Sequence, residues 1–480
     1  MKIKTVIAAC LLALSPSIFA ADLSLGVYLK QMEEGSPAYR SVSESIDAAK
    51  SLLNEKAVLT GAWGFAAANT GVNKSPSQLS VLYGDTQAQT SLDLGVEGRT
   101  DFGLSGKFHF QTSYTSLSGI TPIVIPPLPP LSFITMPNYY TSALVLEFKL
   151  DLLRNSFGSE VKAQSNALEN KNKADIYDRL HSKRELRSET EKAYWKLSLA
   201  REAVKVNREL LERSKKLHEW MQEKIDLNLM DKDDIVQADS DLKYRELSLV
   251  GAEDDEKAAA RGFNALRGKN STEVKETLSA PEEKALRPGK LPAEMPARYD
   301  LLALKLKVKA LREQAKLKAE ALKPELSVAG GASLNGQDPA LGNSISGSLT
   351  TDHYVYGVGV NLKFPFDLAA RDTLASGYQG EVRSAEAGLK QKELEAKIEW
   401  DELQRRLKEV NARLALANEL EGLQKKQADA EREKLKKGNT VTYQVILFEQ
   451  DWGKSKLGVL SAREGLLEIA SRLKLFGKEE

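Results

Sequence analysis

The sequence predicts a mainly α-helical protein with a small β-barrel portion. Two long helical hairpins of one coiled-coil design are duplicated along the chain, and the strands that precede them suit a transmembrane barrel. Three observations predict the helices and the strands. A turn sequence recurs 210 positions further along the chain, an apolar heptad period flanks each copy, and runs of alternating polarity precede each hairpin.

The N-terminus, residues 1–20, has the pattern of a secretory signal peptide. Lys2 and Lys4 precede an apolar run, and small residues end at Ala20. The string IAAC makes Cys10 resemble a lipid acceptor, but the hydrophobic run continues past it, which disfavours lipidation there. Cys10 is the single cysteine of the sequence, so its removal with the signal leaves neither disulfides nor thiolate metal sites.

Short helices are predicted over 21–56, and the strands of the first half follow over 57–150. The first strand reads AVLTGAWGFAAANT, with Leu59, Trp63 and Phe65 on one face. Two more alternating runs, around 92–115, predict an added hairpin. After an uncharged, proline-rich loop, YYTSALVLEFKL alternates again. The apolar positions of these later runs are Leu92, Leu94, Val96, Phe108, Phe110, Tyr114, Tyr140, Leu144, Leu146, Phe148 and Leu150.

The first helical hairpin is predicted over 151–268. Its long helix runs from about residue 155 to about residue 225, which corresponds to ~105 Å at the helical rise per residue. A turn within 223–239 leads to a second helix that ends near Arg267. The heptad seam of the long helix is apolar but partly small and polar, and consists of Ala193, Leu197, Ala200, Val204, Asn207, Leu211, Ser214, His218, Met221 and Ile225.

The second half repeats this order. After a linker over 269–297 and an ascending helix over 298–323, strands are predicted over 324–366, and a second hairpin with a C-terminal segment over 367–480. The strand HYVYGVGVNLKF has its apolar face opposite a face of Gly357, Gly359, Asn361 and Lys363. Adding 210 to the first seam gives the second, Leu403, Leu407, Val410, Leu414, Ala417, Glu421, Gln424, Ala428, Glu431 and Leu435.

The alternating runs suit transmembrane barrel strands and a half-buried soluble sheet equally well. Two strands per half cannot close a barrel within one chain. Open sheet edges cannot face lipid, because their backbone groups would stay unpaired. A barrel would therefore have to be shared between chains. The alternative is a periplasmic coiled-coil spacer protein whose strands form a soluble sheet.

Four segments together resemble the outer membrane efflux protein family, the TolC-like channels. They are ALVLEFKLDLLRNSFGSEVKA, RYDLLALKLKVKA, ALKPELSVAGG and KLKKGNTVTYQVILFEQD. In this family, the elements follow the order helix, two strands, long helix, turn and helix, and this order occurs twice. The predicted elements of this chain have a similar order along nearly the whole length after the signal peptide. The resemblance implies a homotrimer in which each chain gives four strands to one outer-membrane barrel and several helices to a periplasmic tube.

The resemblance also implies what such a chain would do. It would be a channel rather than an enzyme, the exit duct of a tripartite efflux or type I secretion system. Substrates would pass through it passively, from the periplasm or an inner-membrane pump to the exterior. Its partners would be a periplasmic adaptor (membrane fusion) protein, an RND or ABC-type pump and the lipid of the outer membrane.

The hairpin turns would form the entrance at the inner end of this tube. At the second turn the family often has aspartates where this chain has Gln444 and Leu447, so an acidic ring would come from the first turn. Acids at a helix N-terminus also stabilise the helix dipole, and this structural explanation is favoured. The implied entrance residues are Asp231, Asp233, Asp234, Gln237, Gly438, Thr442, Tyr443 and Gln444.

No cofactor, metal or nucleic-acid site is predicted. The four histidines lack metal-ligand spacing, and the glycines of GVGVNLKF lie in a strand rather than before a helix. The 68 Lys and Arg nearly balance the 67 Asp and Glu, which indicates solvated helix faces rather than a nucleic-acid surface. Four of the tryptophans fall in predicted helices, whereas Trp63 suits a membrane interface.

Overall fold

The computed structural model describes residues 23–74, 86–119, 126–127, 138–227, 235–279 and 291–477. The predicted signal peptide, Cys10 and most of the proline-rich loop lie outside these residues. The chain divides into two compact units. We call residues 47–177 and 301–392 the strand unit, and residues 1–46, 178–300 and 393–480 the helical unit.

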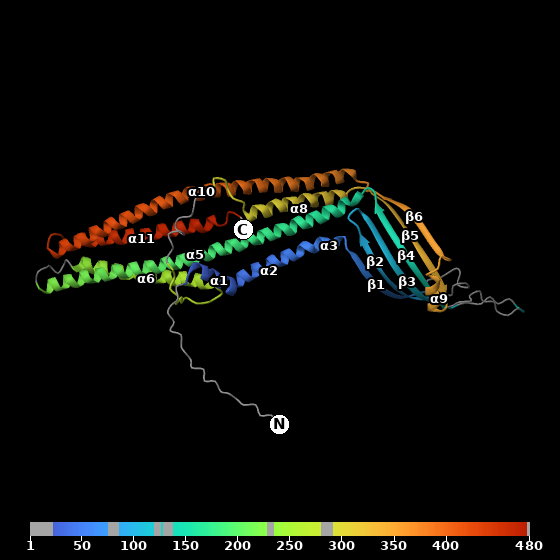
Figure 1. Ribbon diagram of the computed structural model, residues 1–480, viewed down its shortest axis with the longest axis horizontal. Coiled ribbons are helices and arrows are strands. Elements are labelled where there is room, and N and C mark those ends of the chain that lie inside the picture. The colour runs from blue at the N-terminus through green and yellow to red at the C-terminus, as the bar shows by residue number, and fades with distance from the viewer. Residues whose placement is uncertain are drawn as a thin grey trace, which may run out of the picture. The chain divides into compact units, whose positions relative to one another are not determined.

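The strand unit contains one antiparallel sheet of six strands in the order of the sequence (Figure 1). Each strand pairs with the next along 10 to 14 positions. The strands are β1 (Ala62–Asn73), β2 (Thr86–Arg99), β3 (Leu104–Ser118), β4 (Asn138–Asp151), β5 (Glu325–Asp338) and β6 (Tyr354–Lys363).

The sheet contains the predicted hairpin around 92–115 and corrects one expectation, the place of Leu59. The hairpin around 92–115 is an integral part of the sheet, because β2 and β3 carry the ladder from β1 to β4. Among the described residues, the first half therefore supplies four strands and the second half two. Leu59 ends the short helix α3 (Glu55–Leu59) instead of lying in β1, because the helix precedes the Gly61 break.

A short helix, α9 (Leu341–Gly347), lies at one end of the strands and packs against β4 and β5 (Figure 1). The hydroxyl of Ser344 donates to the carbonyl of Gly336 at 3.0 Å and contacts the hydroxyl of Ser142 at 3.0 Å. A Cβ at Gly336 would lie 2.1 Å from the carbonyl oxygen of Ser344. Only glycine therefore fits at this position.

The helices have the predicted lengths. The two long ones are α5 (Ser159–Asp226), of 68 residues, and α10 (Leu368–Lys436), of 69 residues. Each is followed by a helix of 32 residues, α6 (Ile235–Leu266) or α11 (Thr442–Leu473). The other helices among the described residues are α1 (Leu25–Gly35), α2 (Pro37–Ser51), the 3-10 helices η1 (Leu52–Asn54) and η2 (Ser156–Gly158), and α8 (Tyr299–Ala321). No helix in the described part of the chain combines the length and the hydropathy of a membrane span.

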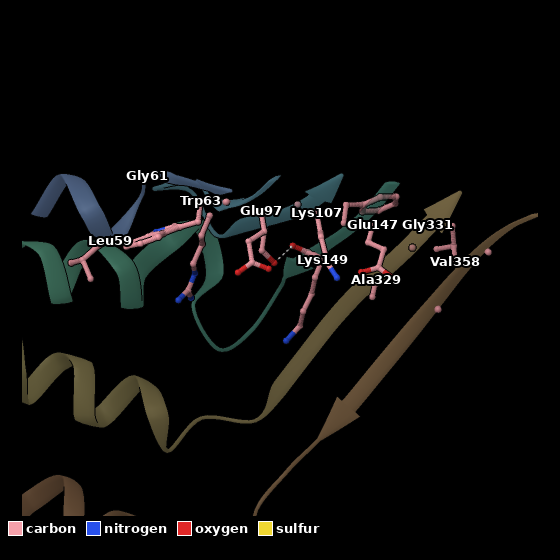
Figure 2. Close-up of a pocket in the computed structure, with 18 residues that line it drawn as sticks. Leu59, Gly61, Trp63, Glu97, Lys107, Glu147, Lys149, Ala329, Gly331 and Val358 are labelled. Carbon is pink, nitrogen blue, oxygen red and sulfur yellow. Dashed lines mark hydrogen bonds between the residues drawn. The ribbon is translucent and has the colours of Figure 1, made fainter. Parts of the chain in front are cut away.

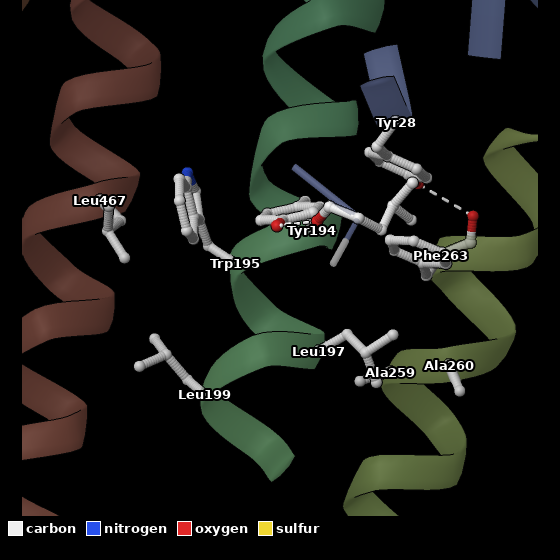
Figure 3. Close-up of a cluster of buried hydrophobic side chains, with 10 residues drawn as sticks. Tyr28, Tyr194, Trp195, Leu197, Leu199, Ala259, Ala260, Phe263 and Leu467 are labelled. Carbon is white, nitrogen blue, oxygen red and sulfur yellow. Dashed lines mark hydrogen bonds between the residues drawn. The ribbon is translucent and has the colours of Figure 1, made fainter. Parts of the chain in front are cut away.

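An aromatic cluster joins α1, α5 and α6 in the helical unit (Figure 3). The rings of Tyr28 and Phe263 stack with centroids 4.0 Å apart, and Tyr194 lies beside them. The Tyr28 hydroxyl donates to the carbonyl of Phe263 at 2.9 Å. Burial raises the pKa of Tyr28, so the phenol remains a hydrogen-bond donor at neutral pH.

The predicted heptad seam of α5 is only part of its buried surface. Its members Leu197, Val204, Leu211 and Met221 are buried as expected. Val206, Leu210 and Leu217 lie outside the seam and are also buried, against residues of α10 and α11. A single heptad period describes a helix with one partner, whereas α5 packs on two sides.

Candidate functional site

The register of the sheet separates its side chains into two faces. One row of directly paired residues is apolar or small, and includes Gly64, Val96, Phe108, Leu146, Ala332 and Tyr356. The adjacent row lies on the opposite face and consists of Trp63, Glu97, Lys107, Glu147, Gly331 and Gly357. We call these the apolar face and the polar face. Because side chains alternate along each strand, every strand contributes to both.

The apolar face exposes large side chains that a water-soluble sheet would bury. Val96, Phe108 and Leu146 are about half exposed, and Val358 and Val360 on β6 more so. Exposed apolar patches of this kind mark contact with lipid or another protein. The predicted alternation of β2, β3, β4 and β6 is confirmed, except that Phe364 lies beyond the end of β6.

Tyrosines limit this apolar band toward the α9 end of the strands. The rings of Tyr114 and Tyr140 lie 4.9 Å apart, and those of Tyr354 and Tyr356 lie 6.1 Å apart. At the opposite strand ends, Phe157 and Phe366 precede the long helices by two residues and are 85% and 91% exposed. Aromatic rings at two levels are typical of the interfaces of a membrane.

The polar face lines a hollow of about 850 Å³. Glu97, Lys107 and Glu147 occupy successive positions of one row across β2, β3 and β4, so unlike charges alternate directly across the strands. Figure 2 shows these side chains together with Lys149 on the same side of the sheet. The Lys149 ammonium lies 2.7 Å from the Glu325 carboxylate. The charged, hollow polar face is therefore suited to contact with water, whereas the apolar face is not.

Trp63 lies on the polar face, contrary to its predicted place on an apolar surface. It pairs with Glu97 in the ladder and lines the hollow. Phe65 lies on the same face, where the Lys107 ammonium sits 4.5 Å from its ring centroid. The sequence alone assigned the larger residues of β1 to the apolar side. The pairing with β2 shows that Ala62, Gly64 and Ala66 are on that side instead.

The predicted entrance residues belong to the two hairpin turns of the helical unit. Asp231, Asp233 and Asp234 lie outside the described residues. Gln237 is exposed in the first turn of α6. At the second turn Gly438, Tyr443 and Gln444 are exposed, whereas Thr442 is buried.

Gly438 ends α10 in the left-handed conformation, with φ at 74°. Its N–H donates to the carbonyl of Leu435, and the N–H of Asn439 donates to that of Lys434, both at 2.9 Å. This pair of bonds is the Schellman arrangement. The turn between α10 and α11 is therefore a defined structure.

Glu431 connects this turn to the body of α10. Its carboxylate accepts from the Thr440 hydroxyl at 2.6 Å and lies 2.9 Å from the Lys434 ammonium. The Thr440 oxygen also lies 2.8 Å from the amide end of Gln444. Because a hydroxyl has one hydrogen, Gln444 fits best as its donor, with amide N and O exchanged. The bonds from Thr440 and Lys434 lower the pKa of Glu431.

A buried ionic cluster joins α5, α10 and α11, and the sequence reasoning missed it. The Glu449 carboxylate, 6% exposed, accepts from the Arg213 guanidinium at 2.8 and 2.9 Å and lies 2.8 Å from the Arg432 guanidinium. Arg213 also bonds Asp429 at 2.7 Å and lies 4.5 Å from the ring centroid of Trp452. The cluster holds α11 against two other helices.

The two arginines respond differently to burial. Burial lowers the pKa of Arg432, and the attraction of Glu449 offsets this only in part. For Arg213, burial acts in the same direction, but the bonds to Glu449 and Asp429 outweigh it and raise the pKa. Both remain charged at neutral pH. Glu449 is therefore the buried acid that two partly buried cations share.

A second polar contact joins α6 to α5 and α11. The Asp241 carboxylate accepts from the Ser214 hydroxyl at 2.8 Å and from the Gln450 amide at 3.2 Å, and lies 3.4 Å from Arg245. Close packing also joins α11 to α5 at Gly453. A Cβ at Gly453 would lie 2.7 Å from the Leu210 side chain. The missing side chain of Gly453 therefore allows α11 to approach α5 closely.

One sequence signal could have revealed the ionic cluster. Glu449 follows Val445 by four positions and precedes Trp452 by three, which places the acid on the same helix face as these two apolar residues. An acid at such a position must be buried with a cation or exposed by a break in the period. The sequence does not identify the cations, because Arg213 lies on another helix.

Several solved structures are similar to the chain over almost its whole length, among them OprN, VceC and CmeC. The outer-membrane channel OprN aligns with a TM-score of 0.66 at 16% identity, covering 95% of this chain and 90% of that one. The outer membrane protein VceC from Vibrio cholerae gives 0.65 at 13%, with 95% and 97% covered. The Campylobacter jejuni CmeC outer membrane channel gives 0.65 at 13%, with 95% and 87% covered.

The chain has the TolC-like fold. The resemblance drawn from the sequence is thereby confirmed at the level of the fold. No family model matches the sequence, and no curated protein matches it either. The TolC-like fold is thus recognisable here from the order of elements rather than from residue identity.

The resemblance led to an expectation of four strands per chain, and this is corrected. The chain has six strands in one sheet among its described residues. The physical cause is that β2 and β3 keep the two-residue alternation of their neighbours. Their apolar residues thus continue the apolar face, and their charged residues continue the polar face.

Proposed function

We propose that the chain is an outer-membrane channel, the exit duct of a tripartite efflux or type I secretion system. It conducts substrates passively from the periplasm or an inner-membrane pump to the exterior. The observation that carries the proposal is the two-faced sheet. An apolar, exposed face bounded by aromatic side chains suits lipid, and a charged, hollow face suits an aqueous lumen.

The assembly we propose is a homotrimer. A sheet with two open edges cannot stand in lipid alone, and a barrel shared by copies of the chain removes the edges. The helical hairpins would extend into the periplasm. There the turns at Asp231, Asp233 and Asp234 and at Gly438 to Gln444 would form the entrance, which meets an adaptor protein and an RND or ABC-type pump.

Two adjacent residues of β2 test the assignment of the faces. Val96→Lys places a charge on the apolar face, which costs about 2 to 4 kcal/mol if that face meets the middle of a bilayer. Glu97→Lys makes the matched change on the polar face. We expect Val96→Lys to reduce the amount of protein assembled in outer membranes several-fold. Glu97→Lys should assemble normally and shift ion selectivity toward anions.

Conductance in planar bilayers tests the channel itself. The purified protein should need detergent for solubility and should form discrete, long-lived pores. A protein that stays in solution without detergent and forms no pore would instead be a periplasmic spacer. Equal assembly of the Val96→Lys and Glu97→Lys variants would also contradict the proposal, because the two faces would then share one environment.

A further inference from the structure

The sheet ends in two edge strands that have no partner within the described chain. β1 pairs only with β2, and β6 only with β5. All 10 residues of β6 are exposed, as are 11 of the 12 residues of β1. We propose that β6 of one copy pairs with β1 of the next, with Val360 opposite Ala66, and that three copies close a barrel of eighteen strands. This inference rests on the proposed outer-membrane assembly.

The strand directions permit this seam. Every neighbouring pair in the sheet is antiparallel, and the number of strands is even. β1 and β6 therefore run in opposite directions. A second copy placed edge to edge continues the antiparallel ladder without a parallel junction, and the head-to-tail contact closes as a ring.

The register of the seam follows from the slope of the sheet. A row of paired residues crosses it through Ala62, Gly98, Gly106, Phe148, Gly330 and Val358. Ala62 is the first residue of β1, at the end of the sheet that joins the helices. At that same end Val358 lies five residues from Lys363, the last residue of β6. From β1 to β6 the row thus moves away from the helix end of the strands by about one residue per strand. The same shift from β6 of one copy to β1 of the next places Val358 opposite Ala68. Because the two strands are antiparallel, Val360 then lies opposite Ala66.

This register uses the edges completely. It sets Lys363 opposite Trp63 and Tyr354 opposite Val72, so that each of the 10 residues of β6 meets a residue of β1. A slope of one residue per strand corresponds to a strand tilt of about 35°, from the rise along a strand and the spacing between strands. Closed barrels have this tilt.

The side chains fit in the same register. The apolar face of β1 is made of small residues, Gly64, Ala66 and Ala68, whereas that of β6 carries Leu362, Val360 and Val358. Large side chains of one copy thus lie beside small ones of the next, and each face of the sheet continues across the seam.

The consequence is a wide pore at the outer membrane. Barrel diameter rises roughly in proportion to strand number, and barrels of about 16 to 18 strands enclose an aqueous channel. The hairpin of β2 and β3 supplies two of the six strands of each chain. It therefore builds a third of the wall and adds Asp93, Glu97 and Lys107 to the lumen.

Disulfide trapping tests the seam. Cys10 is the single cysteine of the sequence, so a Cys10→Ala background allows paired cysteines to be introduced cleanly. Oxidation of the variant with Ala66→Cys and Val360→Cys should yield covalent dimers and trimers on denaturing gels, because directly opposed residues meet disulfide geometry. Thr70→Cys with Tyr356→Cys provides a second pair in the same register, in case the first fails to fold.

The matched control combines Ala66→Cys with Tyr356→Cys. It stays on the same face but is displaced by four residues, about 13 Å along the strand, so it should remain monomeric on the gel. Trapping of the control pair but of neither seam pair would overturn the register. Absence of trapping in all three assembled variants would overturn the seam.

Conductance of the same samples separates this inference from the proposed function. Pores without trapped oligomers would support the proposed channel and contradict the proposed seam. Trapped oligomers without pores would support the seam and contradict the proposed channel. The mass of the native wild-type oligomer gives the number of copies in the assembly. Three copies support eighteen strands, and any other number overturns that count.

Discussion

Glu449 is the residue on which the buried ionic cluster of the helical unit depends. Its single carboxylate faces two guanidinium groups, those of Arg213 and Arg432, both largely buried. Coiled-coil helices gain specificity from such groups because an unpaired buried charge excludes other alignments. The cluster thus fixes the position of α11 along α5.

Glu449→Gln should destabilise the helical unit by about 3 kcal/mol, because it leaves two partly buried cations without their shared acid. The melting temperature followed by helical circular dichroism should fall by several degrees. The control is Glu409→Gln, which removes an acid from an exposed pair with Arg405 and should change stability by less than about 0.5 kcal/mol. Equal effects would show that the cluster contributes no more than a surface pair.

Glu431 makes the second hairpin turn sensitive to acid. Its pKa lies below the ordinary value of 4.5, so its stabilising contribution is present above that value and is lost as the pH falls through its folded pKa. Thr440→Val removes the donated hydrogen bond and should speed amide exchange over residues 434–444 at neutral pH. The difference from wild type should vanish once the pH is below the folded pKa of Glu431. A difference that persists there would mean that Thr440 acts by packing rather than through Glu431.

At the scale of elements, the α10–α11 turn depends on one backbone conformation. Gly438 has a positive φ and nothing within 4 Å of an added Cβ, so a larger residue meets strain but no clash. Gly438→Ala should therefore destabilise the hairpin by about 1 kcal/mol. Denaturant unfolding measures the change.

Gly458→Ala is the matched control for this turn. Gly458 also has open space around it, but it lies within α11, where alanine favours the helix. This substitution should stabilise by about 0.5 to 1 kcal/mol. Opposite signs at the two glycines would confirm the conformational cause, and a common sign would refute it.

The strands show how far sequence patterns reach at this scale. Alternation identified the faces of β2, β3, β4 and β6 correctly, because each has one row of apolar and one of polar side chains. It failed for β1, whose apolar side consists of alanines and glycines while its larger residues, Trp63 and Phe65, lie beside charged partners. The period of a strand is local, but the identity of its faces depends on its neighbours.

At the scale of the whole molecule, the proposed entrance depends on acids of the first turn. A ring of Asp234 side chains around a narrow pore would attract cations, so Asp234→Asn should weaken block by multivalent cations several-fold. Asp239→Asn makes the same charge change in α6, where Asp239 pairs with His218 at 2.8 Å, and should leave the block unchanged. Single-channel recordings with added trivalent cations distinguish the two. Unchanged block by multivalent cations in the Asp234→Asn variant would contradict the proposed ring of Asp234 side chains.

The sequence by itself determined the helices, the turns and the order of elements, because heptad periods, breaks at glycine and strand alternation are properties of neighbouring residues. It also carried the resemblance that the TolC-like fold confirmed. Only the tertiary structure decided that the sheet has six strands, that α5 packs on two sides, and that Glu449 meets Arg213 and Arg432. These features join residues far apart in the chain. Their energy comes from pairing and burial between elements, which no local period records.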